Sequence, residues 1–411
     1  MALITILMDI EEGHVLSSFG LAEALKNQGH EVMYVSIEDN KEFVTRQGFS
    51  FYPMFGDIYP LGFRAKFKKE RSTAAYNRQK EKMHMEKIID GSFDSFFRDV
   101  NPDMLIVSSF LVFESLLLHY KYKVQPVIYT PMLRYHEASL LTECMDMIMN
   151  LPTHLVTRAM EFLDDLSVKF TSLDQLINPI KSFAELVCCP AEFEINPNFS
   201  GTKYYIEPSM RSGDGLGSEH YLDKEKEGKK IIYASLGSQT IRYGEITHVF
   251  FKKMMDMMRD PRMKHLHMIL CVGPELDNES IPPPQEGVTT VRWISQIDLL
   301  QHASLVINHG GLGTVKECIY FGVPMIAFGI RHDQPHNASL IEYHKLGIII
   351  NIEEITIEEL VSKVLAVLED EEIRASLDKM KRLFEQSEIE RPGVRVIERI
   401  LKERQHASVS A

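Results

Sequence analysis

The chain alternates short apolar runs of strand length with longer stretches in which apolar residues recur at helical spacing. In the first half, the apolar run Leu3–Met8 is followed by an amphipathic stretch that ends at Gly29, and a second apolar run, Glu31–Ile37, comes directly after it. This order of strand, helix and strand predicts a parallel sheet that begins at residue 3. Further strands are predicted at Met104–Ser108 and Val127–Tyr129, and residues 137–186 are mostly helical in pattern.

A second series of strands and helices begins after residue 230. Its last two apolar runs are each followed by a turn and then by a helical pattern. In the first of these helices Val315, Cys318 and Ile319 share one face. Pro335 suits the first turn of the second helix, which we expect to end near Gly347. The strands predicted in this half are Ile231–Leu236, Thr289–Arg292, Ser304–Asn308 and Met325–Gly329.

The segment between the two series has the composition of a linker. Residues 207–230 are polar, charged and glycine-bearing. We therefore expect an N-terminal domain at 1–206 and a C-terminal domain at 231–386. Residues 387–411 resume an amphipathic helix after Pro392-Gly393 and can pack back on the N-terminal domain. The sequence thus predicts the α/β class, with two Rossmann-like domains that are each built on a parallel sheet.

Composition and charge narrow the class of protein. With 411 residues, 45% of them hydrophobic, the chain is long enough for two domains that each have a core. Its formal net charge of −13 argues against nucleic acid as a partner, because phosphate backbones are bound by basic surfaces. The five cysteines are odd in number and lack paired metal spacing, so we expect a reducing, cytoplasmic setting. The first apolar run ends at Asp9, which is too early for a signal peptide or a transmembrane segment.

A glycine-rich turn is the most informative feature of the second half. The run His309-Gly310-Gly311-Leu312-Gly313 separates a predicted strand from a predicted helix. Glycines let a ligand approach the backbone, and the unpaired N–H groups of the following helix favour an anion, so the turn suits a phosphate. Asp333 and Gln334 follow the next strand, and the carboxyl ends of parallel strands form one crevice. The pattern predicts a site for an anionic nucleotide.

Several motifs of the chain occur in a familiar order. They are Ser235-Leu236-Gly237-Ser238, Trp293-Ile294-Ser295-Gln296, His309 to Glu317, Gly322-Val323-Pro324 and Asp333-Gln334, with Gly13-His14 and Gly29-His30 in the first half. In these motifs the chain resembles the UDP-glycosyltransferase superfamily (glycosyltransferase family 1), particularly its bacterial members that glycosylate natural products such as macrolides. The resemblance implies a GT-B fold, in which two Rossmann-like domains face each other across a cleft. It places the nucleotide-sugar donor on the C-terminal domain and the acceptor on the N-terminal domain.

The resemblance assigns the nucleoside to three residues. It implies that Trp293 stacks on the uracil, that Gln296 lies beside the nucleoside and that Glu317 holds the ribose hydroxyls. Two structural alternatives stay open. Trp293, the only tryptophan, can be a core residue, and Thr314-x-x-Glu317 is also the pattern of a capping box, in which Glu317 satisfies only backbone donors.

The remaining donor contacts follow the same motifs. The resemblance implies that His309 contacts the diphosphate and that Gly311, Gly313 and Thr314 supply backbone or hydroxyl donors, with Ser238 from the neighbouring loop. A strand-end histidine that faces solvent is the alternative for His309. Asp333 and Gln334 correspond to the pair that holds the donor sugar, although Asp-Gln before a proline is also a common helix start.

The expected catalytic residues are His14 and the residue at position 108. His14 resembles the family's general base, and the unperturbed histidine pKa of about 6.5 suits that role. A solvent-facing loop histidine is the alternative. Many family members carry an aspartate, which orients the histidine, where this chain has Ser108. Either Glu11, Glu12 or Glu114 replaces that aspartate, or the acceptor is acidic enough to need less help.

The reaction implied by the resemblance is inverting, metal-independent transfer of a sugar, expected to be glucose, from a UDP-sugar to a hydroxyl of a small lipophilic acceptor such as a natural product. No dinucleotide fingerprint, Walker loop or Asp-x-Asp motif is present, so we expect neither cofactor nor metal, with the UDP-sugar as co-substrate. Positive charge on the diphosphate is then expected from helix dipoles and from His309. The alternatives are a UDP-sugar epimerase on the same fold and a non-catalytic GT-B protein that binds nucleotide or a partner.

Overall fold

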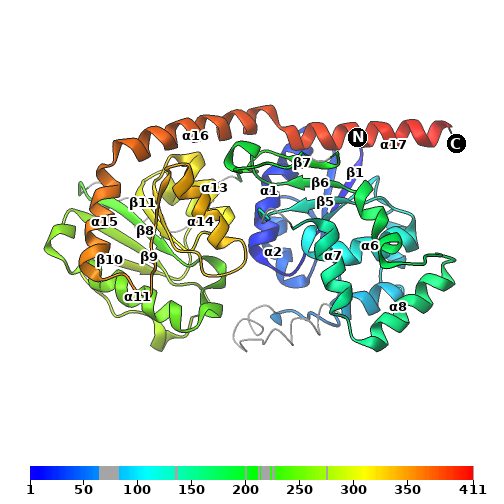
Figure 1. The fold of residues 1–411 in the computed structure, drawn as a ribbon, viewed down its shortest axis with the longest axis horizontal. Coiled ribbons are helices and arrows are strands. Elements are labelled where there is room, and N and C mark those ends of the chain that lie inside the picture. The colour runs from blue at the N-terminus through cyan, green and yellow to red at the C-terminus, as the bar shows by residue number, and fades with distance from the viewer. Residues whose placement is uncertain are drawn as a thin grey trace. The chain divides into compact units, whose positions relative to one another are not determined.

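The chain forms two compact units in the computed structural model, which describes residues 1–63, 83–134, 138–199, 201–211, 213, 223–224, 227–274 and 276–410 (Figure 1). Unit 1 contains Met1–Cys188, Asn196–Ser209 and Arg391–Ala411, and unit 2 contains Cys189–Ile195 and Met210–Glu390. Residues 189–195, expected in the N-terminal domain, therefore belong to unit 2. Of the expected linker, residues 207–209 belong to unit 1, and residues 212, 214–222 and 225–226 lie outside the described part of the chain.

Unit 1 is built on a seven-stranded sheet in the order β3-β2-β1-β4-β5-β6-β7, with parallel pairing throughout. Every residue of the central strands β4 and β5 is buried, whereas the edge strands β3 and β7 are partly exposed. Long apolar runs such as MLIVS in β4 are typical of parallel strands that are covered on both faces. The strands are β1 (Leu3–Leu7), β2 (Glu31–Ser36), β3 (Ser50–Pro53), β4 (Met104–Ser108), β5 (Val127–Thr130), β6 (Ala184–Val187) and β7 (Lys203–Tyr205).

Helices cover both faces of this sheet. Ile106 of β4 packs in one core with Phe19 of α1, while its neighbour Val107 packs in a second core with Leu116 of α6, because successive side chains of a strand point to opposite faces. The helix α17 joins the first core, and its Glu398 accepts a hydrogen bond from His30 Nε2 at 2.7 Å. The helices are α1 (Glu12–Asn27), α2 (Lys41–Arg46), α5 (Asp94–Asp99), α6 (Val112–Tyr122), α7 (Leu140–Met149), α8 (Thr153–Asp165), α9 (Leu173–Ile177) and α17 (Pro392–Ser410).

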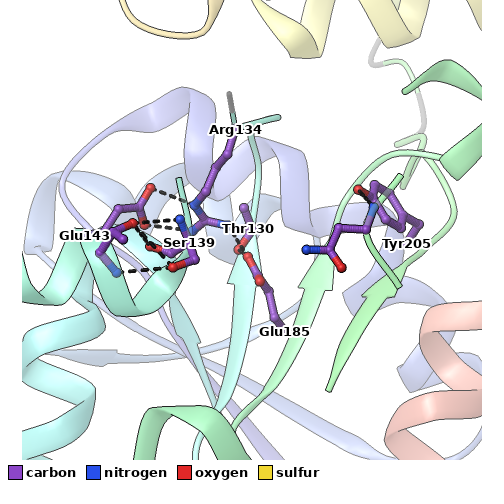
Figure 2. A network of polar contacts seen from close by, with 8 residues as sticks. Thr130, Arg134, Ser139, Glu143, Glu185 and Tyr205 are labelled. Carbon is purple, nitrogen blue, oxygen red and sulfur yellow. Dashed lines mark hydrogen bonds and ion pairs between the residues drawn. The ribbon is translucent and has the colours of Figure 1, made fainter. Parts of the chain in front are cut away.

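A buried arginine ties α7 to the sheet of unit 1. Arg134 follows β5 and donates to both oxygens of Glu143 on α7, at 2.6 and 2.8 Å, and to Glu185 on β6 (Figure 2). The Thr130 hydroxyl donates to the same oxygen of Glu185 at 2.8 Å. The Arg134 side chain is only 3% exposed, and burial would lower its pKa, but the two carboxylates raise the pKa above its usual value. The cluster therefore holds the loop after β5 against two neighbouring elements.

Unit 2 is a doubly wound parallel sheet in the order β10-β9-β8-β11-β12-β13. In Figure 1, α11 and α15 lie on one side of the sheet and α13 and α14 on the other. The strands are β8 (Lys230–Ser235), β9 (Leu266–Cys271), β10 (Val288–Val291), β11 (Ala303–Asn308), β12 (Met325–Ala327) and β13 (Gly347–Ile349). The helices are α11 (Glu245–Met258), α12 (Gln296–Leu300), α13 (Leu312–Phe321), α14 (Gln334–Tyr343), α15 (Ile357–Glu369) and α16 (Glu371–Glu390).

The predicted elements of the second half are present, whereas the sequence pattern does not predict the strands β9 and β13. Val315, Cys318 and Ile319 are all buried, as their shared helical face predicts. Pro335 lies in the first turn of α14, which ends at Tyr343. None of the five cysteines forms a disulfide. In the part of the chain that the structure describes, no helix is long and apolar enough to cross a membrane.

Candidate functional site

In each sheet the order of the strands reverses once. The reversal lies between β1 and β4 in unit 1 and between β8 and β11 in unit 2. Open α/β sheets bind ligands at the carboxyl ends of the strands on either side of such a reversal. His14 and Ser108 lie at the ends of β1 and β4, and Ser238 and His309 follow β8 and β11. The predicted residues of each unit are therefore at the position that its topology favours for a ligand.

The carboxylate that contacts His14 in unit 1 is Asp9. His14 Nδ1 lies 2.8 and 2.9 Å from the two Asp9 oxygens. The Ser108 hydroxyl donates to Asp9 Oδ2 at 2.7 Å, and the backbone N–H of Glu11 donates to Oδ1 at 2.9 Å. Because an ionised carboxylate only accepts hydrogen bonds, Nδ1 of His14 carries the proton. In the neutral histidine the basic lone pair is then on Nε2.

Asp9 is held in its ionised form. Burial would raise the pKa of this carboxyl, but the charge and hydrogen bond of His14, together with the donors of Ser108 and Glu11, keep the pKa below its ordinary value. The carboxylate also lies at the start of α1, where a helix favours negative charge. The residue that faces the imidazole is thus an anion at neutral pH.

His14 belongs to a helix rather than to the loop that the sequence predicts. The helix α1 begins at Glu12, so His14 lies in its first turn. The imidazole stacks on Phe110, with ring centroids 4.1 Å apart and an angle of 3° between the planes, and its side chain is 27% exposed. The alternative of a solvent-facing loop histidine is therefore wrong.

The sequence predicts Glu11, Glu12 or Glu114 as the carboxylate that replaces an aspartate at position 108, and the structure corrects this prediction. Asp9 takes the place because the turn after β1 folds its side chain back over the start of α1. Glu11 occupies the N-cap position of this helix without a side-chain capping bond, and its backbone N–H donates to Asp9. Glu114 instead lies beside His84, with Oε1 at 3.3 Å from Nδ1.

In unit 2 the His309 side chain is enclosed by glycine backbone. A Cβ atom on Gly237 would lie 2.7 Å from His309 Cε1, and a Cβ on Gly311 would lie 2.8 Å from Nε2. The Tyr243 ring is tilted against the imidazole at a centroid distance of 5.8 Å. His309 is buried, so the alternative of a solvent-facing histidine is wrong. Two of the glycines in the predicted motifs therefore make room for the imidazole.

The buried His309 is neutral at physiological pH. Burial lowers its pKa to about 4. A neutral imidazole offers an N–H dipole rather than a positive charge, and the expectation that His309 supplies charge to a bound diphosphate stays a prediction. Its Nδ1 is buried and has no hydrogen-bond partner among the described residues. The start of α13, directly after the turn, is the second expected source of positive potential.

The turn after β11 is tied to the start of α14. Gly310 has a φ of 83°, which glycine adopts at no steric cost, and its N–H donates to Asn308 Oδ1 at 2.7 Å. The Asn337 amide donates to the Gly310 carbonyl at 2.9 Å and to Asp333 Oδ2 at 2.8 Å. These bonds fix the glycine turn relative to the loop that carries Asp333.

Gln334 is a buried residue at the start of α14. Its amide nitrogen donates to the Tyr243 hydroxyl at 2.9 Å, and its oxygen accepts the backbone N–H of Arg331 at 3.0 Å. Asp333 precedes the helix directly. Asp333 and Gln334 therefore form the start of a helix, which was one of the two roles expected from the sequence. Gln334 also orders the loop at residues 330–334.

Gln296 and Glu317 are in contact in unit 2, and Trp293 lies three residues before Gln296 in the sequence. Trp293 follows β10 and is 42% exposed, so the alternative of a core tryptophan is wrong. Gln296 begins α12, and its amide nitrogen donates to Glu317 Oε2 and, at 3.3 Å, to Thr314 Oγ1. The exposed Trp293 thus lies three residues before Gln296, whose side-chain amide is hydrogen-bonded to the Glu317 carboxylate.

The capping box proposed for Thr314 and Glu317 is absent. The helix α13 begins at Leu312 with Gly311 before it, and no side chain caps its start. Thr314 and Glu317 are therefore inside the helix, where the Glu317 carboxylate meets Gln296 instead of backbone donors. Gly313 is exposed in the first turn, and Ser238 lies in the 3-10 segment Gly237–Tyr243 after β8.

The sequence motifs do not predict Arg211, which lies beside Glu317. Its Nε lies 3.9 Å from Glu317 Oε1, and both side chains are mostly buried. Arg211 comes from residues 207–230, whose composition predicts only a linker. No signal in the sequence distinguishes it from the other charged residues of that segment. In the described ranges, no group of three or more His, Cys, Asp or Glu side chains is arranged to hold a metal ion.

Known proteins resemble this chain over almost its whole length. Residues 126–392 match the family described as UDP-glucoronosyl and UDP-glucosyl transferase. The NDP-glycosyltransferase YjiC of Bacillus subtilis is 25% identical over 373 residues, which are 90% of each chain. The demethyllactenocin mycarosyltransferase of Streptomyces fradiae is 26% identical over 398 residues, which cover 93% of this chain and 81% of that protein.

Solved structures share the fold at low sequence identity. The crystal structure of the glycotransferase of kitacinnamycin matches with a TM-score of 0.72 and 16% identity, over 97% of this chain and 98% of that one. The calicheamicin glycosyltransferase CalG4 matches with a TM-score of 0.67 and 18% identity, over 94% and 95% of the two chains. The chain therefore belongs to the UDP-glucuronosyl and UDP-glucosyl transferase family, has the GT-B fold and is a nucleotide-sugar-dependent glycosyltransferase.

Proposed function

We propose that the protein catalyses inverting, metal-independent transfer of glucose from UDP-glucose to a hydroxyl of a small lipophilic acceptor such as a natural product. The contact between Asp9 and His14 carries this proposal, because it leaves Nε2 of the neutral histidine as the basic atom. A hydroxyl that attacks a sugar needs a group that removes its proton. Histidine suits this role near neutral pH.

In the proposed reaction, His14 Nε2 takes the proton of the acceptor hydroxyl while the hydroxyl oxygen bonds to the anomeric carbon of glucose. The bond between that carbon and the diphosphate oxygen breaks, and UDP leaves with the bonding electrons. One displacement inverts the anomeric configuration. The ionised Asp9 stabilises the imidazolium that forms.

The proposed donor site follows the geometry of unit 2. Trp293 is assigned to stack on the uracil, since its indole is exposed. Gln296 is placed beside the nucleoside, and Glu317 is assigned to the ribose hydroxyls. The hydrogen bond from Gln296 to Glu317 supports this pairing, because it brings an amide and a carboxylate together three residues after Trp293.

The diphosphate is assigned to the turn after β11. Gly311, Gly313 and Thr314 would supply N–H or hydroxyl donors, with the Ser238 hydroxyl and the N–H of neutral His309. Backbone donors at a helix start stabilise a leaving anion without a metal ion. Asp333 and Gln334 are assigned to the hydroxyls of the transferred sugar.

A cavity in unit 1 supports a lipophilic acceptor. It has a volume of about 190 Å³ and an almost entirely apolar lining from α6, α7, α8 and α9, which includes Phe113, Leu117, Ala159 and Leu163. Val156 and Met160 also line it and are partly exposed. An apolar ring or alkyl group gains free energy when it leaves water for such a cavity, by roughly 25 cal/mol per Å² of buried surface.

The names of the relatives agree with this substrate class. The protein from Streptomyces fradiae is named as a mycarosyltransferase of demethyllactenocin, and a solved relative, VinC, was crystallised with dTDP. The donor nucleotide is therefore tested with UDP-glucose and dTDP-glucose side by side.

The test is transfer from UDP-glucose to a panel of phenols, flavonoids and macrolide aglycones, followed by mass spectrometry, with and without EDTA. We expect a product mass increased by one hexose, no effect of EDTA, and a loss of about 10²–10⁴-fold in kcat/KM for His14→Ala. Full activity of His14→Ala would remove the base from the proposal.

Two controls separate the alternative functions. Incubation with UDP-glucose alone should leave the sugar unchanged, whereas an epimerase would convert it without an acceptor. Binding of UDP, measured by thermal shift, should accompany turnover. Tight UDP binding with no product on any acceptor would indicate a non-catalytic protein.

A further inference from the structure

We propose that Asp9 is the carboxylate that positions the base His14, and that Ser108 in turn positions Asp9. The inference rests on the proposed function, since it concerns how the proposed base is held. It departs from the pattern of the family, in which an aspartate at the position of Ser108 orients the histidine. In this chain the carboxylate comes from the turn between β1 and α1, which leads directly to the base.

The register of the sheet explains how the carboxylate can come from either strand. β1 and β4 are adjacent and parallel, and Leu7 is paired with Val107. The residues just beyond this pair, at the ends of both strands, therefore reach the same space in front of α1. Ser108 Oγ lies 2.7 Å from Asp9 Oδ2, so the two side chains already meet there. A carboxylate at one position leaves room only for a small donor at the other.

The charge of Asp9 explains why position 108 carries a hydroxyl. Both residues are buried. A second carboxylate at 108 would lie at hydrogen-bonding distance from Asp9, and two buried carboxylates that close cannot both ionise. A serine instead donates to Asp9 and leaves its negative charge directed at His14. We therefore infer that an aspartate introduced at 108 lowers the activity of this chain while Asp9 is present.

The stacking of Phe110 completes the positioning. The ring of Phe110 lies parallel to the imidazole at 4.1 Å, which fixes the plane of His14. Within that plane the contact with Asp9 fixes Nδ1, so Nε2 points in one direction only. Asp9, Ser108 and Phe110 thus determine both the tautomer and the orientation of the proposed base.

The first test is spectroscopic and needs no acceptor. Protein labelled with ¹⁵N-histidine is titrated by two-bond ¹⁵N–¹H correlation NMR, with His14 assigned from a His14→Gln sample. We expect the Nδ1–H tautomer for neutral His14 in the wild type. In Asp9→Asn the protonation midpoint of His14 should fall, because a negative charge that stabilises the imidazolium is gone. Unchanged signals of the other histidines show that the variant is folded.

The matched control is Glu114→Gln, because Glu114 is a predicted carboxylate that the structure places beside His84 instead. This substitution should leave the titration of His14 unchanged. An unchanged His14 midpoint in Asp9→Asn, or an equal shift in Glu114→Gln, would overturn the assignment of Asp9.

The second test is a double-mutant cycle on kcat/KM for UDP-glucose and an acceptor from the panel above. Asp9→Ser should lose roughly 10²–10³-fold, within the range of general-base catalysis. Ser108→Asp alone should lower the activity at pH 7, and the double variant Asp9→Ser/Ser108→Asp should recover at least about tenfold over Asp9→Ser. An increase in activity in Ser108→Asp alone would contradict the inference.

The two proposals fail in different ways. If His14→Ala keeps its activity, the proposed base is wrong, whatever the titration of His14 shows. If His14→Ala is inactive while Asp9→Asn and Asp9→Ser keep full activity and the wild-type pH profile, the base stands and the positioning role of Asp9 falls.

Discussion

Gly311 and Gly313 differ sharply in what an added methyl group would meet, although both belong to the same turn. A Cβ on Gly311 would lie 2.8 Å from Nε2 and 3.0 Å from Cε1 of His309, whereas a Cβ on Gly313 has no atom within 4 Å. The backbone of Gly311, with φ −64° and ψ 131°, suits any residue, so Gly311→Ala introduces no backbone strain. Gly313→Ala is therefore a matched control for a purely steric perturbation.

The expected size of the effect follows from these distances. Carbon contacts are optimal at roughly 3.5–4.0 Å, so the imidazole has to move by about 0.5–1 Å. It cannot retreat freely, because the backbone of Gly237 lies against the ring as well. Overpacking of this kind costs about 1–3 kcal/mol of stability. If the displaced His309 loses a hydrogen bond to a charged phosphate, worth about 1.5–3 kcal/mol, the Kd for UDP rises roughly 10–100-fold.

The assay is titration calorimetry with UDP, combined with thermal unfolding of both variants. Gly311→Ala should bind UDP roughly 10–100-fold more weakly, as derived above. Gly313→Ala leaves His309 in place, so its loss of affinity for UDP should be smaller than that of Gly311→Ala. A folded Gly311→Ala protein with wild-type affinity would refute the contact between His309 and the diphosphate. Equal losses in both variants would show that the effect does not pass through His309.

Three further predictions concern stability, pH and the acceptor. Arg134→Met leaves the buried Glu185 without its cation. We expect the free energy of unfolding, measured with urea, to fall by about 3–5 kcal/mol. A fall of less than about 1 kcal/mol would show that the ion pair is not important for stability. Because burial lowers the pKa of His309 to about 4, the unfolded state binds a proton between about pH 6.5 and 4 that the folded state does not. The free energy of unfolding should therefore fall as the pH drops through this range. His309→Asn should remove about 3 kcal/mol of that fall by pH 4. If the pH dependence of urea unfolding is the same in His309→Asn as in the wild type, the burial of a neutral imidazole is contradicted. Met160→Trp narrows the apolar cavity of unit 1. It should raise the KM for a lipophilic acceptor about tenfold, equivalent to about 1.4 kcal/mol, without changing the Kd for UDP. An unchanged KM would show that the acceptor binds elsewhere.

The sequence pattern predicts β1, β2, β4, β5, β8, β10, β11 and β12, and it misses β3, β6, β7, β9 and β13. The runs that became β1, β2, β4, β8 and β11 are apolar along most of their length because both faces of these strands are covered. The edge strand β3 is short and only partly buried, so its residues Ser50–Pro53 carry no continuous apolar run. Edge position alone does not decide the signal, because the edge strand β10 is predicted, whereas the interior strands β6 and β9 are not.

The sequence pattern also predicts only part of the candidate site. Motif spacing predicts which residues follow the strand ends, and the structure places His14, Ser108, Ser238 and His309 there. It does not predict which carboxylate reaches His14, because the contact of Asp9 depends on how the turn between β1 and α1 folds back. It also does not predict that His309 is neutral, since its burial comes from Gly237, a residue 72 positions earlier on another strand end.

The proposed reaction is a single displacement assisted by His14. The most direct measurement is the anomeric configuration of the product, read by ¹H NMR from the coupling of the anomeric proton after reaction with UDP-glucose, whose sugar is in the α configuration. We expect a β-glucoside from the wild type. An α-glucoside would contradict the single displacement and, with it, the role of His14.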